Sequence, residues 1–246
     1  HPRGEGLGRA APPRPSWRTT ALMLRSRSHR GIAFAGLSIP GNLAMATWKG
    51  ALLFVTPSPF LLANVVFAIG IAAIKFLAVR SYRMTAGQSP RAVDPENHRL
   101  RTYRTIASML LGLASVFVVG SISTLLIWRE SATYSMAVGI AVAAVAFVEL
   151  IMAAHGIWSA RRNQDPLVEA VKFANLGAAF ILIALTQTAI MSFAYEGDSS
   201  VPGAVGGIIF GSLAAIAGGT MLIRPVGTRN AAARTRVTKR GGSIEP

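Results

Sequence analysis

Two charged residues lie inside long apolar stretches, and they are the side chains best placed to do chemistry in this sequence. Glu149 lies in the stretch from Tyr134 to Trp158, and Lys75 lies in the stretch from Pro59 to Val79. Each stretch has about the 20 residues that a helix needs to cross a bilayer. A charge near the middle of such a helix costs about 2.5–3.5 kcal/mol on insertion. Glu149 must therefore be paired, hydrated or protonated.

Two roles for Glu149 stay open. Lys75 is its best partner by depth in the membrane, so the two side chains can form a buried ion pair that ties helices together. Alternatively, Glu149 carries a proton or a cation across the membrane. We expect the buried pair and keep a small ion- or proton-coupled transporter as the alternative function.

Other polar side chains in the apolar stretches extend this set. His155 follows Glu149 by six residues, which is about 240° further round a helix, so the two share no face and predict no metal site. Asn175, Thr186 and Gln187 lie in a later stretch and must contact other helices, because polar groups go unsatisfied in lipid. These three residues and His155 are candidates for a polar pathway, although hydrogen bonding between helices is the simpler interpretation.

Five apolar stretches must position these side chains. The chain of 246 residues is 52% hydrophobic and only 14% charged, which is too apolar for a typical soluble domain. We therefore expect an all-α polytopic membrane protein, a bundle of five transmembrane helices over residues 59–223. The five stretches are Pro59–Val79, Thr105–Trp128, Tyr134–Trp158, Phe173–Ala194 and Gly203–Ile223.

Basic residues mark one side of these stretches. Segments 80–104, 160–168 and 224–246 carry six, two and six Lys and Arg residues, whereas the connectors 129–133 and 195–202 carry one and none. The positive-inside rule places the first three segments in the cytoplasm, with 224–246 as a basic tail. The charges predict attraction to anionic lipid headgroups and no nucleic acid, since a nucleic-acid-binding domain gathers its basic residues on one folded face.

The amino-terminal segment does not fit this arrangement, because five spans would place it outside. Residues 1–30 contain seven arginines and four prolines. A basic region, an apolar region and then Ala44-Met45-Ala46 is the order of a signal peptide. We therefore expect residues 1–46 to be disordered or signal-like and absent from the mature protein, with an interfacial segment over 47–58.

Two alternatives for this segment stay open. The chain can begin at Met45, or residues 31–55 can form a sixth span. Pro40, Asn42 and Lys49 fall within that span and count against it.

Local signals also predict how helices begin and where they pack. Asp94-Pro95 and Asp165-Pro166 each place a capping carboxylate before a proline at the first helical position. In the last stretch, small residues recur every four positions and predict a packing face, because they let helix backbones approach closely in lipid. Packing within one chain is the simpler interpretation of this face, and a homodimer seam is the alternative. The residues of the face are Gly203, Gly207, Gly211, Ala215 and Gly219.

Motifs for catalysis, cofactors or metals are absent from the sequence. It has no cysteine, no phosphate-binding glycine loop and no nucleophile elbow. We therefore expect no enzyme, but a membrane-embedded scaffold, binding or accessory subunit. Its partners would be the bilayer with its anionic headgroups and another membrane protein or a second copy of the chain.

One resemblance bears on the source of the chain. The stretch Asp165-Pro-Leu-Val-Glu-Ala-Val-Lys-Phe-Ala-Asn-Leu, followed by Leu185-Thr-Gln-Thr-Ala-Ile-Met-Ser-Phe, resembles a segment of small uncharacterised polytopic membrane proteins of bacteria. The likeness also touches Tyr134 to Trp158. It implies a bacterial cytoplasmic membrane and brings no activity to transfer.

Overall fold

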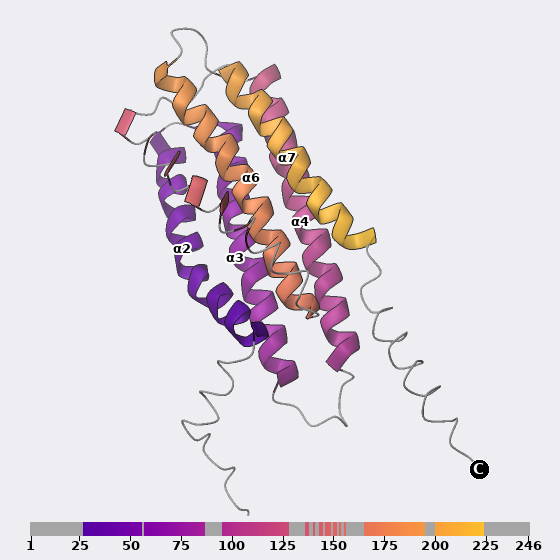
Figure 1. The fold of residues 1–246 in the computed structure, drawn as a ribbon. Coiled ribbons are helices and arrows are strands. Elements are labelled where there is room, and N and C mark those ends of the chain that lie inside the picture. Colours follow the sequence, from indigo (N-terminus) through magenta and orange to yellow (C-terminus); the bar gives the residue numbers. More distant parts are fainter. Residues whose placement is uncertain are drawn as a thin grey trace, which may run out of the picture.

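The computed structural model describes residues 27–55, 57–86, 95–127, 165–194 and 200–223, together with scattered positions between 136 and 155. The regular structure in this part of the chain is helical, as the sequence predicts. Its long helices pack side by side in one bundle (Figure 1). They are α2 (Arg27–Val55), α3 (Pro59–Ala86), α4 (Pro95–Leu126), α6 (Pro166–Ala194) and α7 (Ser200–Ile223).

Among the described residues, four helices are long and apolar enough to cross a membrane. They are Pro59–Ala86, Pro95–Leu126, Pro166–Met191 and Val201–Ile223, and they match four of the five predicted spans. The described part thus contains four such helices rather than five. The remaining prediction, Tyr134–Trp158, falls mostly outside it, as does Glu149, although the positions described within that stretch are helical.

Capping explains why α6 begins well before its apolar stretch. Asp165 accepts a hydrogen bond from the backbone N–H of Leu167 through Oδ1 at 3.0 Å, directly before Pro166 opens α6. This is the predicted N-cap, since a capping oxygen satisfies one of the free amides of the first turn. α4 begins at Pro95, with Glu96 in its first turn, and its predicted capping residue, Asp94, lies outside the described residues.

The structure of residues 27–55 differs from the one predicted for the amino-terminal segment. Residues 27–55 are one continuous helix, Pro40 included, where we expected a disordered or signal-like segment and then an interfacial one. Ile32, Ala35 and Ala46 are buried in this helix, and packing against α3 supports a helix across the proline. The absence of residues 1–46 from the mature protein stays a prediction.

α2 runs antiparallel to α3. A Cβ built on Gly36 would contact Val79 near the end of α3, whereas Lys49 bonds Asn64 near the start of α3. α2 therefore begins at the end of the bundle where α3 finishes, which we call the basic end because it carries exposed arginines. These are Arg80, Arg83, Arg101 and Arg104.

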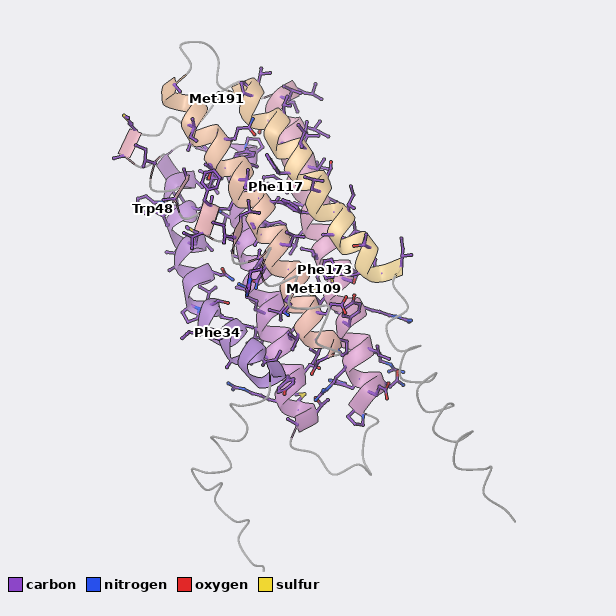
Figure 2. The ribbon with its side chains drawn as sticks, viewed as in Figure 1. Phe34, Trp48, Met109, Phe117, Phe173 and Met191 are labelled. Carbon is purple, nitrogen blue, oxygen red and sulfur yellow. The ribbon has the colours of Figure 1, made fainter. Side chains whose placement is uncertain are left out.

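α4 packs against α3, α6 and α7. Its side chain Phe117, labelled in Figure 2, is fully buried. The centroid of its ring lies 5.4 Å from that of Phe60 and 6.2 Å from that of Phe67. Such tilted ring pairs add stability beyond the buried area. The aromatic contacts fix α3 against α4, and this leaves the other side of α3 to face α2 and α6.

Candidate functional site

A cavity of about 630 Å³ lies between α2, α3 and α6. Its walls are mostly apolar and include Phe34 of α2, Phe67 and Ile71 of α3, and Leu182 of α6. Ala153, in the partly described stretch between α4 and α6, also lines it. Pockets for small ligands are typically about 300–1,000 Å³ with apolar walls and a few placed polar groups.

Three lysines supply the charge of this cavity, one from each helix. They are Lys49 of α2, Lys75 of α3 and Lys172 of α6. Lys49 and Lys75 are only 6% and 5% exposed, and Lys172 is half-buried. Buried ammonium groups are costly in a membrane and mark functional sites by default.

A neutral amide partner holds the deepest of the three ammonium groups. Lys49 donates from Nζ to Oδ1 of Asn64 at 3.3 Å. Asn64 is itself fully buried, and its Nδ2 donates to the backbone carbonyl of Phe60 at 3.1 Å. This chain of bonds ties α2 to α3 at the level furthest from the basic end.

Contacts between the helices give the level of each lysine. Gly31 faces Val168, so Lys172, four residues further along α6, lies ~6 Å deeper than Gly31 at 1.5 Å per residue. Gly36 faces Val79, which places Lys75 ~14 Å beyond Gly31 by the same rise.

Two asparagines of the cavity lie between or near these two levels. Asn175 lies one turn beyond Lys172 on α6 and lines the cavity, at ~10 Å from the level of Gly31. Asn42 of α2 also lines it, at ~16 Å. The Nδ2 of Asn42 is buried and has no hydrogen-bond partner among the described residues. These polar groups thus lie ~6–16 Å from the level of Gly31, whereas Lys49 lies ~27 Å from it.

The structure brings only some of the predicted polar residues together. Lys75 and Asn175 share the cavity, whereas His155 is exposed and lies outside its lining. Thr186 is buried elsewhere on α6, and Gln187 points to α7, where its Nε2 donates to the carbonyl of Pro202 at 3.4 Å. The four residues of the predicted polar pathway therefore do not lie along one continuous path. They are His155, Asn175, Thr186 and Gln187.

The predicted small-residue face of α7 packs closely against neighbouring helices over the first half of the helix, but not at its end. A Cβ on Gly203 would lie 2.8 Å from Oγ1 of Thr188, and one on Gly211 would lie 2.7 Å from Val118. Gly207 faces Ser121 and Phe60 in the same way.

Further along α7 the close approach moves off the four-residue repeat. Gly218 lies against the backbone of Leu111, whereas Gly219 has nothing within 4 Å and Ala215 is half-buried. Four residues advance a helix by about 400°, so a strict four-residue repeat turns ~40° per step away from its starting face.

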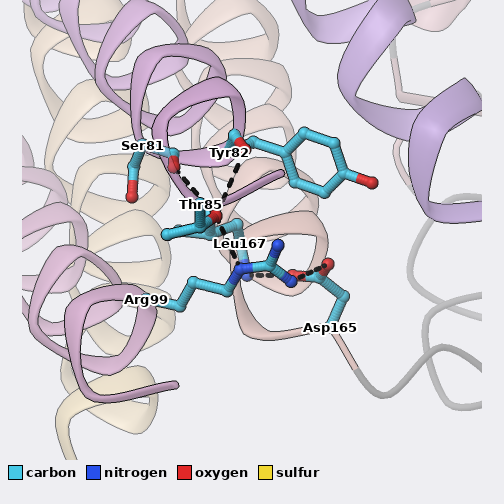
Figure 3. A network of polar contacts seen from close by, with 6 residues as sticks. All are labelled: Ser81, Tyr82, Thr85, Arg99, Asp165 and Leu167. Carbon is cyan, nitrogen blue, oxygen red and sulfur yellow. Dashed lines mark hydrogen bonds and ion pairs between the residues drawn. The ribbon is translucent and has the colours of Figure 1, made fainter. Parts of the chain in front are cut away.

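A polar junction joins α3, α4 and α6 at the basic end (Figure 3). Arg99 of α4 donates to Asp165 at 3.2 Å and through Nε to Oγ1 of Thr85 at 2.9 Å. Its guanidinium also lies 5.1 Å from the ring centroid of Tyr82. Because Asp165 also caps α6, the junction fixes the first turn of that helix, and Val168 of that helix borders the cavity.

Sequence reasoning missed Lys49, Lys172 and Asn42 as site residues. Lys49 and Asn42 counted only as obstacles to a span. Each of them is a charged or polar residue within an apolar segment. The same feature marked Lys75 as a candidate site residue, so it could have marked these three as well.

Comparison with known proteins gives no match. No family model, no curated protein sequence and no solved structure matches the chain.

Proposed function

We propose that this chain is a multi-pass protein of a bacterial cytoplasmic membrane and serves there as a ligand-binding or accessory subunit. The cavity between α2, α3 and α6 carries the proposal, because a pure scaffold needs no cavity of this size lined by three lysines. A cavity of this size also costs packing contacts.

The proposed arrangement keeps the five predicted spans across the membrane. It also keeps the tail 224–246 on the cytoplasmic side. To these it adds α2 as a further crossing. α2 has 29 residues, or ~43 Å of helix, and lies antiparallel to α3. Its side chain Phe54 is 93% exposed and suited to lipid.

A crossing by α2 also removes the conflict in the charge distribution. The basic end then faces the cytoplasm, and the seven arginines of residues 1–30 lie on the same side as those of segment 80–104. A signal peptide is the competing interpretation, and the burial of Ile32, Ala35 and Lys49 against the bundle favours retention of α2.

A small ion- or proton-coupled transporter that uses Glu149 is the second candidate. Ala153 favours it, because this residue lines the cavity and follows Glu149 by four residues, about one helical turn. The same spacing supports the proposed pair between Glu149 and Lys75. A transporter predicts that Glu149→Gln folds normally and loses flux, whereas a binding subunit tolerates it.

Native mass spectrometry after extraction in a mild detergent tests the binding role. We expect the wild-type protein to retain a small-molecule mass. Ala178→Leu, which puts a larger side chain into the cavity wall, should lose that mass, whereas Ala73→Leu on the exposed side of α3 should retain it. A wild-type protein free of small-molecule adducts, or equal retention by the two variants, would contradict a role for the cavity.

A further inference from the structure

We infer that the cavity between α2, α3 and α6 binds a compact, uncharged ring compound with a carbonyl oxygen, such as a ketone or a quinone. Asn42 donates a hydrogen bond to that oxygen, and the ring lies in the apolar part of the cavity beyond Asn42. This inference rests on the proposed function and names the class of its ligand. It draws on one unsatisfied donor, on the side chains of the wall and on the length of the cavity.

One buried donor of the wall needs an acceptor. Asn42 lines the cavity, and its Nδ2 is buried without a hydrogen-bond partner among the described residues. The buried amide of Asn64, by contrast, donates to the carbonyl of Phe60 and accepts from Lys49. Because a buried donor without an acceptor is costly, a ligand that brings an acceptor oxygen to Asn42 is favoured.

The polar side chains of the wall can donate more hydrogen bonds than they can accept. In the described part of the chain they include no carboxylate, and they are Ser38, Asn42, Lys49, Lys75, Lys172 and Asn175. An ammonium group only donates, and the hydroxyl of Ser38 already donates to the carbonyl of Ala35. Such a wall suits a ligand that accepts hydrogen bonds better than one that donates them, as an amine does.

The lysines of the wall give no reason for an anionic ligand. Lys49, Lys75 and Lys172 each already interact with other groups of the protein, so none of them is a free countercharge. An anion would therefore lose its hydration in the cavity without a new partner of opposite charge, which is costly in an apolar site. An uncharged carbonyl oxygen accepts the hydrogen bond of Asn42 without that cost.

The length of the cavity limits the ligand to a compact shape. On α2, Lys49 follows Asn42 by seven residues, so the space between their levels is ~10 Å long. Its wall is apolar and includes Met45, Ile71 and Ile181. Fused rings fill such a length, whereas a long hydrocarbon chain does not fit it. Because a methionine sulfur makes favourable contacts with aromatic rings, Met45 suits an aromatic member of this class.

Equilibrium dialysis of the full chain in phosphatidylcholine nanodiscs at neutral pH tests the inference. Empty nanodiscs give the partition into lipid, so that affinities are compared at equal mole fractions of probe in the bilayer. The probes share a naphthalene ring: menadione carries carbonyl oxygens, methylnaphthalene has none and naphthoate carries a negative charge. The chain has no cysteine to react with menadione. We expect menadione to bind about 5-fold more tightly than methylnaphthalene, the factor for one net hydrogen bond, and more tightly than naphthoate.

A matched pair of variants tests the role of Asn42. Asn42→Leu replaces the amide with an apolar group of the same branched shape. It should weaken menadione binding about 5-fold and leave methylnaphthalene binding within about twofold. Its thermal stability should not fall, because the change removes a donor that has no partner in the described part of the chain. Asn97→Leu, the same change at the exposed start of α4, should alter the binding of neither probe.

The outcomes distinguish this inference from the proposed function. Equal binding of menadione and methylnaphthalene, or an equal loss of both in Asn42→Leu, would overturn the acceptor at Asn42 and leave an apolar binding cavity. Tighter binding of naphthoate would overturn the uncharged head. The absence of binding above empty nanodiscs would overturn the ligand class, whereas the binding role is judged separately by the mass retained in native mass spectrometry. Unchanged menadione binding in Ala178→Leu would show that the ring lies outside the cavity, which overturns the inference.

Discussion

Two neighbouring glycines of α7 should respond in opposite directions to the same added methyl group. Gly218 lies against the backbone of α4, so a Cβ there would be 2.8 Å from the nitrogen and 3.1 Å from Cα of Leu111. Gly219, the next residue, has nothing within 4 Å of the same added atom. Gly218→Ala and Gly219→Ala are therefore a matched pair that differs in packing and little else.

The expected magnitudes follow from these distances. Backbone atoms cannot rotate away, so α4 and α7 must separate by ~0.5–1 Å before ordinary contact at about 3.5–4.0 Å is restored. Overpacking of this kind costs about 1–3 kcal/mol, whereas alanine in place of a helical glycine contributes about 0.5–1 kcal/mol. Gly218→Ala should lower the free energy of unfolding by about 0.5–2 kcal/mol, and Gly219→Ala should raise it by about 0.5–1 kcal/mol.

Thermal unfolding of the purified variants in one detergent, followed by circular dichroism, measures the difference. For a chain of this size, each kcal/mol shifts Tm by about 2–4 °C, so the two variants should lie several degrees apart on either side of the wild type. Equal Tm values would show that α4 and α7 do not approach at Gly218. A more stable Gly218→Ala than Gly219→Ala would refute the assigned face of α7.

Three further predictions concern the ion pairs and the topology. Lys75→Met alone should lower Tm by leaving Glu149 without its partner, and adding Glu149→Gln should restore part of the loss; additive losses in this double-mutant cycle would show that the two do not meet. A reporter fused after Arg236 should be cytoplasmic and one inserted near Asp198 external, and an external signal at the first site would overturn the proposed orientation. Asp165→Ala removes both the cap of α6 and an ion pair, so unfolding should become easier by about 1–3 kcal/mol; an unchanged Tm in low salt would refute a stabilising junction.

Local signals in the sequence predicted much of the fold. Four of the predicted spans coincide with apolar helices, because the length of an apolar stretch is fixed by the thickness of the bilayer. The Asp165-Pro166 cap was predictable for a similar reason, since a cap depends only on neighbours in the chain.

The role of α2 could not be predicted in the same way. Pro40, Asn42 and Lys49 each argue against a span when the segment is considered alone. Lys49 is accommodated by Asn64, a residue of the next helix, and neighbouring helices can satisfy the backbone that a proline leaves open. Such compensation depends on which helix packs alongside, and no local pattern encodes that choice.

The candidate site was predictable only in part, because a cavity depends on the register between helices. Lys75 and Asn175 stood out as polar residues in apolar stretches, and both line the cavity. The levels that bring Asn42 beside Lys75 follow from contacts such as Gly36 with Val79, which the sequence does not specify.

The contact between Lys49 and Asn64 and the contact between Arg99 and Asp165 differ in when they can form during synthesis. Lys49 and Asn64 are 15 residues apart, and α2 and α3 are separated by three residues, so the deep charge can find its amide while the hairpin is still entering the bilayer. Arg99 and Asp165 are 66 residues apart, and at about 5–20 residues per second the ribosome needs ~3–13 s to deliver the second after the first. We expect the α2–α3 hairpin to have formed already in nascent chains that are arrested before α4. A probe attached at position 49 would then be protected from solvent in these arrested chains. The Arg99 junction then closes late in biogenesis, and until it does the α6 side of the cavity stays open to the lipids in which the protein is made.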